Sequence, residues 1–543
     1  MADIDGLPSQ VNILTLNCWG IPYICPERPN RLAEIGRHIT KAYPMPHIVG
    51  LQECFSRHDF KRIHQETRSV LPYAKLYYSA PFGAGLAILS RWPIVETSFF
   101  RYPLNGSPTA FTHGDWYVGK GVAYARIQYG KASDNVIDVF NTHIHASYPG
   151  SNEYLCHRIA QAWELGKLLR FALQCRRGRA LVVALGDLNS EPTSLPCRIV
   201  KHLVPEMHDT WLQFSLQREL SSRSGERRIT TQKTDSSIQD GATYGSSYNT
   251  WMWTRGQRAR YLEQRDTRPD QLISPSDFDH SQSIRIDYVL ANVAVPRDHT
   301  PQDNNDSAVN PSADKLRSWN KIENTVGFTQ DDGLWTVKAA KVGMIDRHPV
   351  LGYSLSDHLS VEVTLVFEQR QQRNLQTLPL ELSDPSCSGS SISTGDKSTF
   401  HGASGLYKTL RASVDVTSKL EESNGVVDPD GLLEEILHIL RDYKLMRQKR
   451  AWWRKARLGV AGIVLMGSLA GVWVIGKFGG TRFLLAIAGA LAASFAVSDV
   501  CRNLLFEFSE AAALRELEWE VRNANAGHYN DRVSVDQVNS IRP

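Results

Sequence analysis

The sequence lacks the cysteine pattern of a disulfide-stapled or zinc-binding domain. Its eight cysteines are scattered over 543 residues, and no two of them form a CxxC pair. This spacing argues against a zinc module, and so long a chain does not suggest a disulfide framework. No apolar signal-peptide core follows Met1, so we expect reduced thiols and a main folded part that faces the cytosol.

A strong charge of one sign is also missing. The net charge is +4, from 61 Lys and Arg against 57 Asp and Glu. Total charge therefore gives no reason to expect nucleic acid or another polyanion as a partner. The chain is 42% hydrophobic and 22% charged, which excludes disorder over its whole length.

Residues 1–370 alternate short β-rich runs with helical stretches, which predicts an α/β or α+β sandwich. A helical pattern fits Tyr154–Leu173. Two polar stretches, near 215–282 and 296–335, are expected to be surface insertions. The predicted strands are Val11–Leu16, Ile48–Leu51, Leu86–Leu89, Val136–Asn141, Leu181–Leu185, Arg285–Leu290 and Val361–Phe367.

The rest of the chain divides by composition into four segments. They are a Ser-rich linker (371–405), an amphipathic helix with a basic juxtamembrane cluster (406–457), two apolar spans (458–501) and a tail expected in the cytosol (502–543). The run Leu458–Gly476 carries no charge and fits the ~20 residues that cross a bilayer. The run Phe483–Ser498 is marginal in length, and a buried helix is the alternative. We therefore expect a transmembrane hairpin in an integral membrane protein.

Basic and aromatic side chains precede the first span. Six Lys and Arg lie between positions 447 and 457, with Trp452 and Trp453 among them. Basic residues favour the cytoplasmic side and tryptophans favour the interface, so a hairpin would leave both of its ends in the cytosol. The same cluster would attract anionic phospholipids, by ~1 kcal/mol per basic residue near the surface.

Polar side chains end two of the predicted strands near the N-terminus. Asn17 ends the first strand, and Glu53 follows the second. Mg²⁺ prefers few carboxylates and several waters, so one such glutamate suffices as a ligand. In isolation Asn17 is equally typical of a turn, and Glu53 of a solvated strand end.

Histidines and acids recur at later strand ends. His143 and His145 are two residues apart, which would place both on one face of a strand. Hard-cation chemistry favours a proton or hydrogen-bond role for one of them over a metal pair. Asp187 and Asn189 have the same spacing, and a carboxylate with an amide can orient a water or a phosphate oxygen.

Asp357 and His358 are adjacent, like a histidine base beside its orienting acid. Neighbouring residues of an extended strand point apart, however. We therefore expect Asp357 to orient a different histidine, and favour His143. Asp287 supplies one more acid on a strand.

In their order along the chain, these residues resemble the endonuclease/exonuclease/phosphatase superfamily. The matching set is Asn17, Glu53, His143, Asp187-x-Asn189, Asp287 and Asp357-His358. The resemblance covers residues 11–368 and implies Mg²⁺-dependent hydrolysis of a phosphoester. The fold class that it implies is α/β, a four-layered α/β sandwich, here followed by a C-terminal transmembrane helical hairpin.

Narrower similarity concerns the substrate. The segments Asn17–Pro22 and Thr142–Ala146, with the two C-terminal spans, are similar to neutral sphingomyelinases. The layout is closest to the fungal inositol phosphosphingolipid phospholipases C. This implies a membrane phosphosphingolipid as substrate, ceramide as product, and the endoplasmic reticulum or mitochondria as candidate locations. Sphingomyelin hydrolysis and a nuclease of the same superfamily are alternatives, the latter disfavoured by the membrane hairpin; headgroup and oligomeric state stay open.

The segment Gly114–Lys120 reads GxxxxGK but fails as a Walker A motif. Gly121 stands where Ser or Thr is required, and Val122–Tyr129 predicts a strand where a helix is needed. The segment is similar to the P-loop-like region of the sphingomyelinase family, in which an Asp and a Lys five residues apart act as a switch. Asp115 and Lys120 have that spacing.

The resemblance implies metal-assisted attack of water on a phosphodiester. Either Asp187 or His358 could orient or deprotonate the water, and we favour His358 as the base. The other expected roles are metal binding by Glu53 and Asn17, positioning of water and phosphate by Asp187 and Asn189, and stabilisation of the phosphoryl oxygens by His143 and Lys120.

Overall fold

The structure is a computed structural model. It describes residues 7–110, 113–148, 153–175, 180–223, 238, 240–265, 275, 277–294, 333–368, 429–474, 479–502 and 506–540. The predicted Ser-rich linker and nearly all of the second polar insertion lie outside these residues. The part of the chain before residue 370 and the C-terminal helices are treated in turn below.

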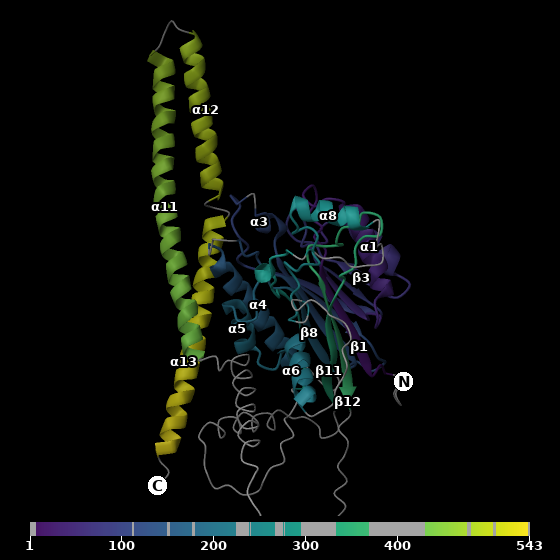
Figure 1. Ribbon diagram of the computed structural model, residues 1–543. Coiled ribbons are helices and arrows are strands. Elements are labelled where there is room, and N and C mark those ends of the chain that lie inside the picture. The colour runs from purple at the N-terminus through teal and green to yellow at the C-terminus, as the bar shows by residue number, and fades with distance from the viewer. Residues whose placement is uncertain are drawn as a thin grey trace, which may run out of the picture.

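Two six-stranded mixed sheets form the centre of the N-terminal domain (Figure 1). The first has the order β11-β12-β1-β2-β4-β3, and the second β5-β6-β7-β8-β10-β9. The strands are β1 (Gln10–Asn17), β2 (Ile48–Gln52), β3 (Tyr73–Leu76), β4 (Ala87–Ser90), β5 (Ile94–Arg101), β6 (Gly121–Gln128), β7 (Val136–His143), β8 (Leu181–Asp187), β9 (His208–Asp209), β10 (Asp287–Ala291), β11 (Leu334–Gly343) and β12 (Ser360–Glu368). All seven predicted strands are confirmed, with ends that differ by no more than two residues.

Alternation along the strands divides the apolar residues between two faces. In β1, Val11 and Ile13 join a core that contains residues of both sheets, whereas Leu14 and Leu16 pack under the helices α1 (Arg28–Lys41) and α2 (Arg57–Thr67). On the second sheet, α4 (Leu155–Gln174) and α5 (Leu195–Leu203) cover the outer face. The order helix, sheet, sheet, helix confirms the predicted four-layered sandwich.

The first polar insertion is more than a surface loop. Its described part includes α8 (Arg255–Arg265) and the 3-10 turn η1 (His280–Gln282). Trp253 is only 2% exposed, and Asn249 and Thr250 are buried too. The expectation of a plain surface insertion is therefore wrong for these residues, because they pack against the loop that precedes β12. Before residue 370, the described residues also include the helices α3 (Asp115–Val118) and α6 (Thr210–Arg223).

Two C-terminal helices, α11 (Pro429–Val474) and α12 (Gly479–Arg502), are long and apolar enough to cross a membrane. Only 11% of the apolar window of each is buried inside the protein. A core helix of a soluble protein would be mostly buried, so these windows are suited to lipid. The two helices pack side by side and project beyond one end of the sandwich (Figure 1).

The last segment forms a docked helix, α13 (Phe508–Ser540), where the sequence indicated only a tail. Leu514, Leu517 and Val521 of α13 are buried in the same cluster as the outer face of α4. Leu432, Leu433, Ile436 and Leu440 of α11 join that cluster and confirm the predicted amphipathic helix. The N-terminal part of α11, which precedes its candidate membrane span, and α13 are thus packed against the N-terminal domain through α4.

Candidate active site

The inward-facing rows of the two sheets end in polar residues at one end of the sandwich. Asn17, His143 and Asp187 each continue an inward row by period two, at the last position of β1, β7 and β8. Residue pairing places His143 opposite Asp187 and Asp187 opposite Asp287. The polar side chains of these four residues therefore lie close together at the end of the apolar core.

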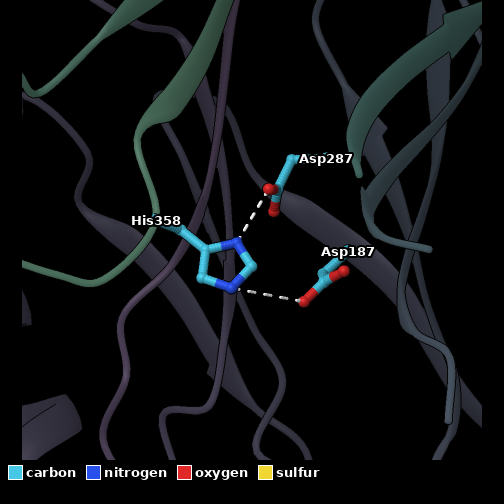
Figure 2. Close-up of side chains that lie close together, drawn as sticks. All are labelled: Asp187, Asp287 and His358. Atoms are coloured by element: carbon cyan, nitrogen blue, oxygen red, sulfur yellow. Dashed lines mark hydrogen bonds and ion pairs between the residues drawn. The ribbon is translucent and has the colours of Figure 1, made fainter. Parts of the chain in front are cut away.

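His358 enters this cluster from the loop before β12, and Figure 2 shows it between Asp287 and Asp187. His358 Nδ1 lies 2.8 Å from Asp287 Oδ2, and His358 Nε2 lies 3.9 Å from Asp187 Oδ2. One donor atom from each of the three residues lies within 4.8 Å of the others, a grouping that could hold a metal ion. The hydrogen bond to Asp287 engages Nδ1 and leaves Nε2 facing Asp187.

The carboxylates around His358 control its charge. Burial alone lowers the pKa of His358, but Asp287, Asp357 and Asp187 outweigh burial and raise the pKa well above 6.5. Burial, followed by the charge of Asp287, raises the pKa of Asp187 to about 6. His143 shows the opposite trend, because burial and then the charge of Lys120 lower its pKa well below 6.5.

Asp357 does not orient His143, so this prediction is wrong. His143 Nε2 lies 3.5 Å from Asp187 Oδ2, because β7 and β8 are neighbours in register. Asp357 belongs to the loop before β12 in the other sheet, where its Oδ1 accepts a hydrogen bond of 3.4 Å from Ser356 Oγ. The orienting acid of His358 is instead Asp287, 71 residues away in the chain.

Glu53 and Asn17 lie beside the carboxylate cluster. Asn17 Nδ2 donates to Glu53 Oε1 and to Asp187 Oδ2, each at 3.1 Å. Asn17 Oδ1 accepts from the backbone N–H of Trp19 at 2.9 Å. In this orientation Asn17 offers hydrogen atoms, not its oxygen, to the cluster, so it acts as a bridge between carboxylates.

The second carboxylate oxygen of Glu53 is a candidate metal ligand. Glu53 Oε2 is buried and has no hydrogen-bond partner among the described residues. Burial raises the pKa of Glu53, so the charged form needs a cation beside it. An unpaired carboxylate oxygen near other carboxylates fits a hard divalent cation, for which oxygen donors are preferred.

Two pairs of residues that are two positions apart do not share a strand face as expected, because each strand ends at the first member of its pair. β7 ends at His143, and His145 turns away to place its Nε2 3.4 Å from Asp115 Oδ2. β8 ends at Asp187, and Asn189 follows in a turn with φ 45°. Asn189 still reaches the cluster, because its backbone N–H donates to Asp187 Oδ1 at 2.8 Å.

The GxxxxGK segment carries a buried ion pair at the edge of the cluster. Lys120 Nζ lies 2.8 Å from Asp115 Oδ1 and donates to the carbonyl of Ile144 at 2.8 Å. Asp115 also accepts from the hydroxyl of Tyr148 at 3.1 Å. The next element is the strand β6, which confirms the rejection of a Walker A motif.

A layer of amides below the site was missed at the sequence level. Gln52 Nε2 donates to Asn141 Oδ1 at 2.7 Å and to Thr15 Oγ1 at 3.0 Å, which joins the two sheets. Asn141 Nδ2 in turn donates to the carbonyls of Leu51 and Ala87. Asn141 belongs to the same inward-facing row of β7 as His143. Its position two residues before His143 was the sequence signal from which its place between the sheets could have been predicted.

Comparisons with known proteins agree with this geometry. A family model described as "Endonuclease/Exonuclease/phosphatase family" matches residues 14–358. An inositol phosphosphingolipids phospholipase C of Schizosaccharomyces pombe is 34% identical, over 68% of this chain and 70% of its own. A putative neutral sphingomyelinase of Caenorhabditis elegans is 38% identical over 37% of this chain and 46% of its own. The human sphingomyelin phosphodiesterase 2 is 34% identical, and the match covers 38% of this chain and 46% of the human protein.

Proposed function

Because the chain belongs to the endonuclease/exonuclease/phosphatase family, we propose that it hydrolyses inositol phosphosphingolipids in a phospholipase C-type reaction. The products are ceramide and a phosphorylated headgroup. The observation that carries the proposal is the buried Asp287–His358 pair, which faces Asp187 beside the unpaired oxygen of Glu53. The candidate membrane spans of α11 and α12 support a substrate that resides in a bilayer, because α11 is itself packed on the same domain through its N-terminal part.

His358 is the proposed general base. Its Nδ1 is held by Asp287, so Nε2 can take a proton from water on the side of Asp187. Asp187 and Asn189 position the water and the phosphate. Water attacks phosphorus, and the bond from phosphorus to the ceramide oxygen breaks. The departing oxygen takes up a proton from solvent, and His358 releases its own proton to solvent.

The site fits Mg²⁺ as the cofactor. Glu53 would hold the ion through Oε2, and Asp187 lies close enough to Asn17 and Glu53 to share in that site. When bound, Mg²⁺ would act as a Lewis acid and neutralise charge on the phosphate. Lys120 and His143 would add positive charge and a hydrogen bond for the phosphoryl oxygens, and Asp115 holds Lys120 in place.

Sphingomyelin is the second candidate substrate. It is favoured by the two relatives that match a smaller part of the chain, a putative neutral sphingomyelinase and a sphingomyelin phosphodiesterase. The protein spans less than half of the length of these relatives, so they support the family of reactions more than the headgroup. Nucleic acid is not a proposed partner. The loops Trp19–Cys25 and Tyr78–Gly85, which flank the site, contain no Lys or Arg that could track a phosphate backbone.

Anionic phospholipids are a proposed partner of the juxtamembrane part of α11. Arg447 and Arg454 are committed to ion pairs with Glu507, at 3.2 and 2.8 Å. Lys449, Lys455 and Arg457 are exposed and remain available to lipid headgroups. With the N-terminal domain on the same side as this basic cluster, the proposed orientation places the domain in the cytosol.

The proposal is tested by a headgroup panel with the purified full chain in mixed micelles. Phosphoinositol ceramide, sphingomyelin, a phosphoinositide and abasic DNA are compared with and without Mg²⁺. Release of ceramide from phosphoinositol ceramide only when Mg²⁺ is present supports the proposal. Cleavage of the phosphoinositide or the DNA alone would replace it with another activity of the family.

A further inference from the structure

Two uncharged loops at the mouth of the site expose large apolar side chains. In Trp19–Cys25, Tyr23 is fully exposed and Ile24 is 72% exposed. In Tyr78–Gly85, Tyr78 and Phe82 are 62% and 60% exposed. Neither loop contains a charged residue, so each offers apolar surface to water without a polar rim.

Both loops lie at the end of the sandwich that carries the site. The first loop directly follows Asn17 at the end of β1. The second joins β3 to β4, and β4 pairs with β2 so that Ala87 is opposite Leu51, two residues before Glu53. Because β2 lies between β1 and β4, the two loops lie on either side of Glu53.

The membrane hairpin leaves the domain at this same end. Arg450 of α11 pairs with Glu153, immediately before α4, at 2.7 Å. The first apolar span begins eight residues later at Leu458, about 12 Å further along a helix that rises 1.5 Å per residue. Figure 1 shows the hairpin projecting past the end of the domain that carries α3 and α8.

The backbone conformation of Tyr23 holds its ring away from the domain. Its φ is 66°, the left-handed region that bulky residues rarely adopt. Tyr23 lies in a turn closed by a hydrogen bond of 3.1 Å from the backbone N–H of Cys25 to the carbonyl of Ile21, and this turn leaves its ring in solvent. Backbone strain of this kind persists at ligand-contacting positions, because the surrounding structure holds it there.

We propose that Tyr23, Ile24, Tyr78 and Phe82 form a membrane-contact rim that inserts into the interfacial layer of the bilayer crossed by α11 and α12. Tyrosine suits the headgroup level, where its ring is apolar and its hydroxyl is hydrated, and Phe82 and Ile24 reach the acyl boundary. Insertion of the rim brings the active site close to the lipid headgroups. This inference rests on the proposed function, since it supplies the route by which a membrane lipid enters.

The rim is also bonded to the segment that carries Asp115 and Lys120. The ring of Phe82 lies 5.9 Å from that of Tyr117, and its backbone N–H donates to the carbonyl of Tyr117. Ser79 Oγ donates to the carbonyl of Gly119 at 2.7 Å. The second loop is therefore bonded to Gly119, the residue directly before Lys120.

Photo-crosslinking tests the rim without any need for turnover. A genetically encoded benzoylphenylalanine replaces Tyr23 or Phe82 in the full chain, reconstituted in phosphatidylcholine vesicles. Phe171 is the matched control, because it is 69% exposed near the C-terminal end of α4, which runs away from the site. Lipid adducts at positions 23 and 82, about tenfold above position 171, are expected from burial of an aromatic ring in lipid.

Equal lipid adducts at all three positions, or adducts to a second protein chain, would overturn the rim. A second readout compares Tyr23→Ser with Phe82→Ser and Phe171→Ser for hydrolysis of substrate in vesicles and of a monomeric short-chain analogue. The rim variants are expected to lower the vesicle rate about tenfold more than the monomer rate. If position 82 crosslinks to lipid but the wild type cleaves no phosphosphingolipid, the proposed function is wrong while the membrane-contact rim is supported.

Discussion

His157 Nε2 lies 2.8 Å from the hydroxyl oxygen of Tyr443, two residues separated by 286 positions in the chain. His157 Nδ1 accepts from the backbone N–H of Gly106 at 2.8 Å, so Nε2 carries the hydrogen that is donated to Tyr443. Tyr443 in turn donates to Glu510 Oε1 of α13 at 2.5 Å. A single buried chain of hydrogen bonds thus joins α11 and α13 to the loop that leads to Asp115.

Tyr443→Phe is expected to loosen this junction. The substitution removes the hydroxyl that bridges His157 Nε2 and Glu510 Oε1 and leaves these two atoms only their direct contact of 3.4 Å, at a cost of about 1–3 kcal/mol. The thermal midpoint of the detergent-solubilised chain should fall, and turnover with it, because His157, whose Nδ1 holds the backbone N–H of Gly106, is then positioned less firmly. Tyr73→Phe is the control, since Tyr73 is 42% exposed. Equal midpoints for the two variants would mean that the junction contributes nothing to stability.

Glu53→Gln is expected to abolish turnover and leave the fold intact. The change replaces the unpaired oxygen Oε2 by a neutral amide while Asn17 keeps a partner at the other atom. Calorimetric titration with Mg²⁺ should show lost or greatly weakened binding, whereas the control Glu206→Gln, at an exposed turn, should bind normally. Near wild-type activity of Glu53→Gln at saturating Mg²⁺ would remove Glu53 from the metal site.

His358→Ala should lower activity by about 10²–10⁴-fold, as expected for loss of a general base. A base must be neutral, and the carboxylates raise the pKa of His358, so activity should rise with pH through that pKa. Asp287→Asn removes one of these negative charges and should move the acidic limb of the pH–rate profile to lower pH.

The residual activity of His358→Ala decides between the two candidate bases. If His358 is the base, the acidic limb disappears. If Asp187 is the base, the limb persists and moves to higher pH, because the positive charge of His358 lowers the pKa of Asp187. The full pH–rate profile of this variant therefore resolves the choice that the sequence leaves open.

Lys120→Ala is expected to reduce turnover strongly and to destabilise the fold by ~3–5 kcal/mol, because Asp115 is left buried without its cation. Adding Asp115→Ala should restore part of the stability, but not the activity. The exposed pair Arg126–Glu96 serves as the control cycle, with a coupling of ~1 kcal/mol or less. Additive effects of the two substitutions on turnover would show that Asp115 and Lys120 do not act as a unit.

Lys449, Lys455 and Arg457 should give the enzyme its dependence on anionic lipid. Replacing all three by Gln is expected to weaken activation by phosphatidylserine vesicles, and high salt should have the same effect on the wild type. Arg454→Gln is an informative comparison, because it breaks an ion pair with Glu507 and so should affect stability more than lipid dependence. Full activity of the triple variant on neutral vesicles, equal to that on anionic ones, would contradict the role of the cluster.

The alternation of side chains between the two faces of a strand predicted much of the fold and part of the site. The inward rows of β7 and β8 carry His143 and Asp187 to the end of the core, as period two requires. Alternation fails beyond the end of each strand, so it misplaced His145 and Asn189, which lie two residues past β7 and β8. The pairing of His358 with Asp287 depends on how the two sheets pack, which local sequence does not specify.

The docking of α13 also escaped prediction, for a physical reason. Its buried residues Leu514, Leu517 and Val521 recur at helical spacing, but the helix has no core of its own. These three residues become buried only because the outer face of α4 and the helix α11 offer apolar side chains for them to contact. Trp163 Nε1 completes the contact by donating to Glu520 Oε2 at 2.7 Å.

The measurement that tests the central claim most directly is hydrolysis of phosphoinositol ceramide in water enriched in ¹⁸O, with both products analysed by mass spectrometry. Attack of water on phosphorus predicts that the label enters the phosphorylated headgroup and that the released ceramide carries none. The Glu53→Gln variant should form neither product. Label in the ceramide, or release of ceramide phosphate in place of ceramide, would contradict a phospholipase C-type reaction at this site.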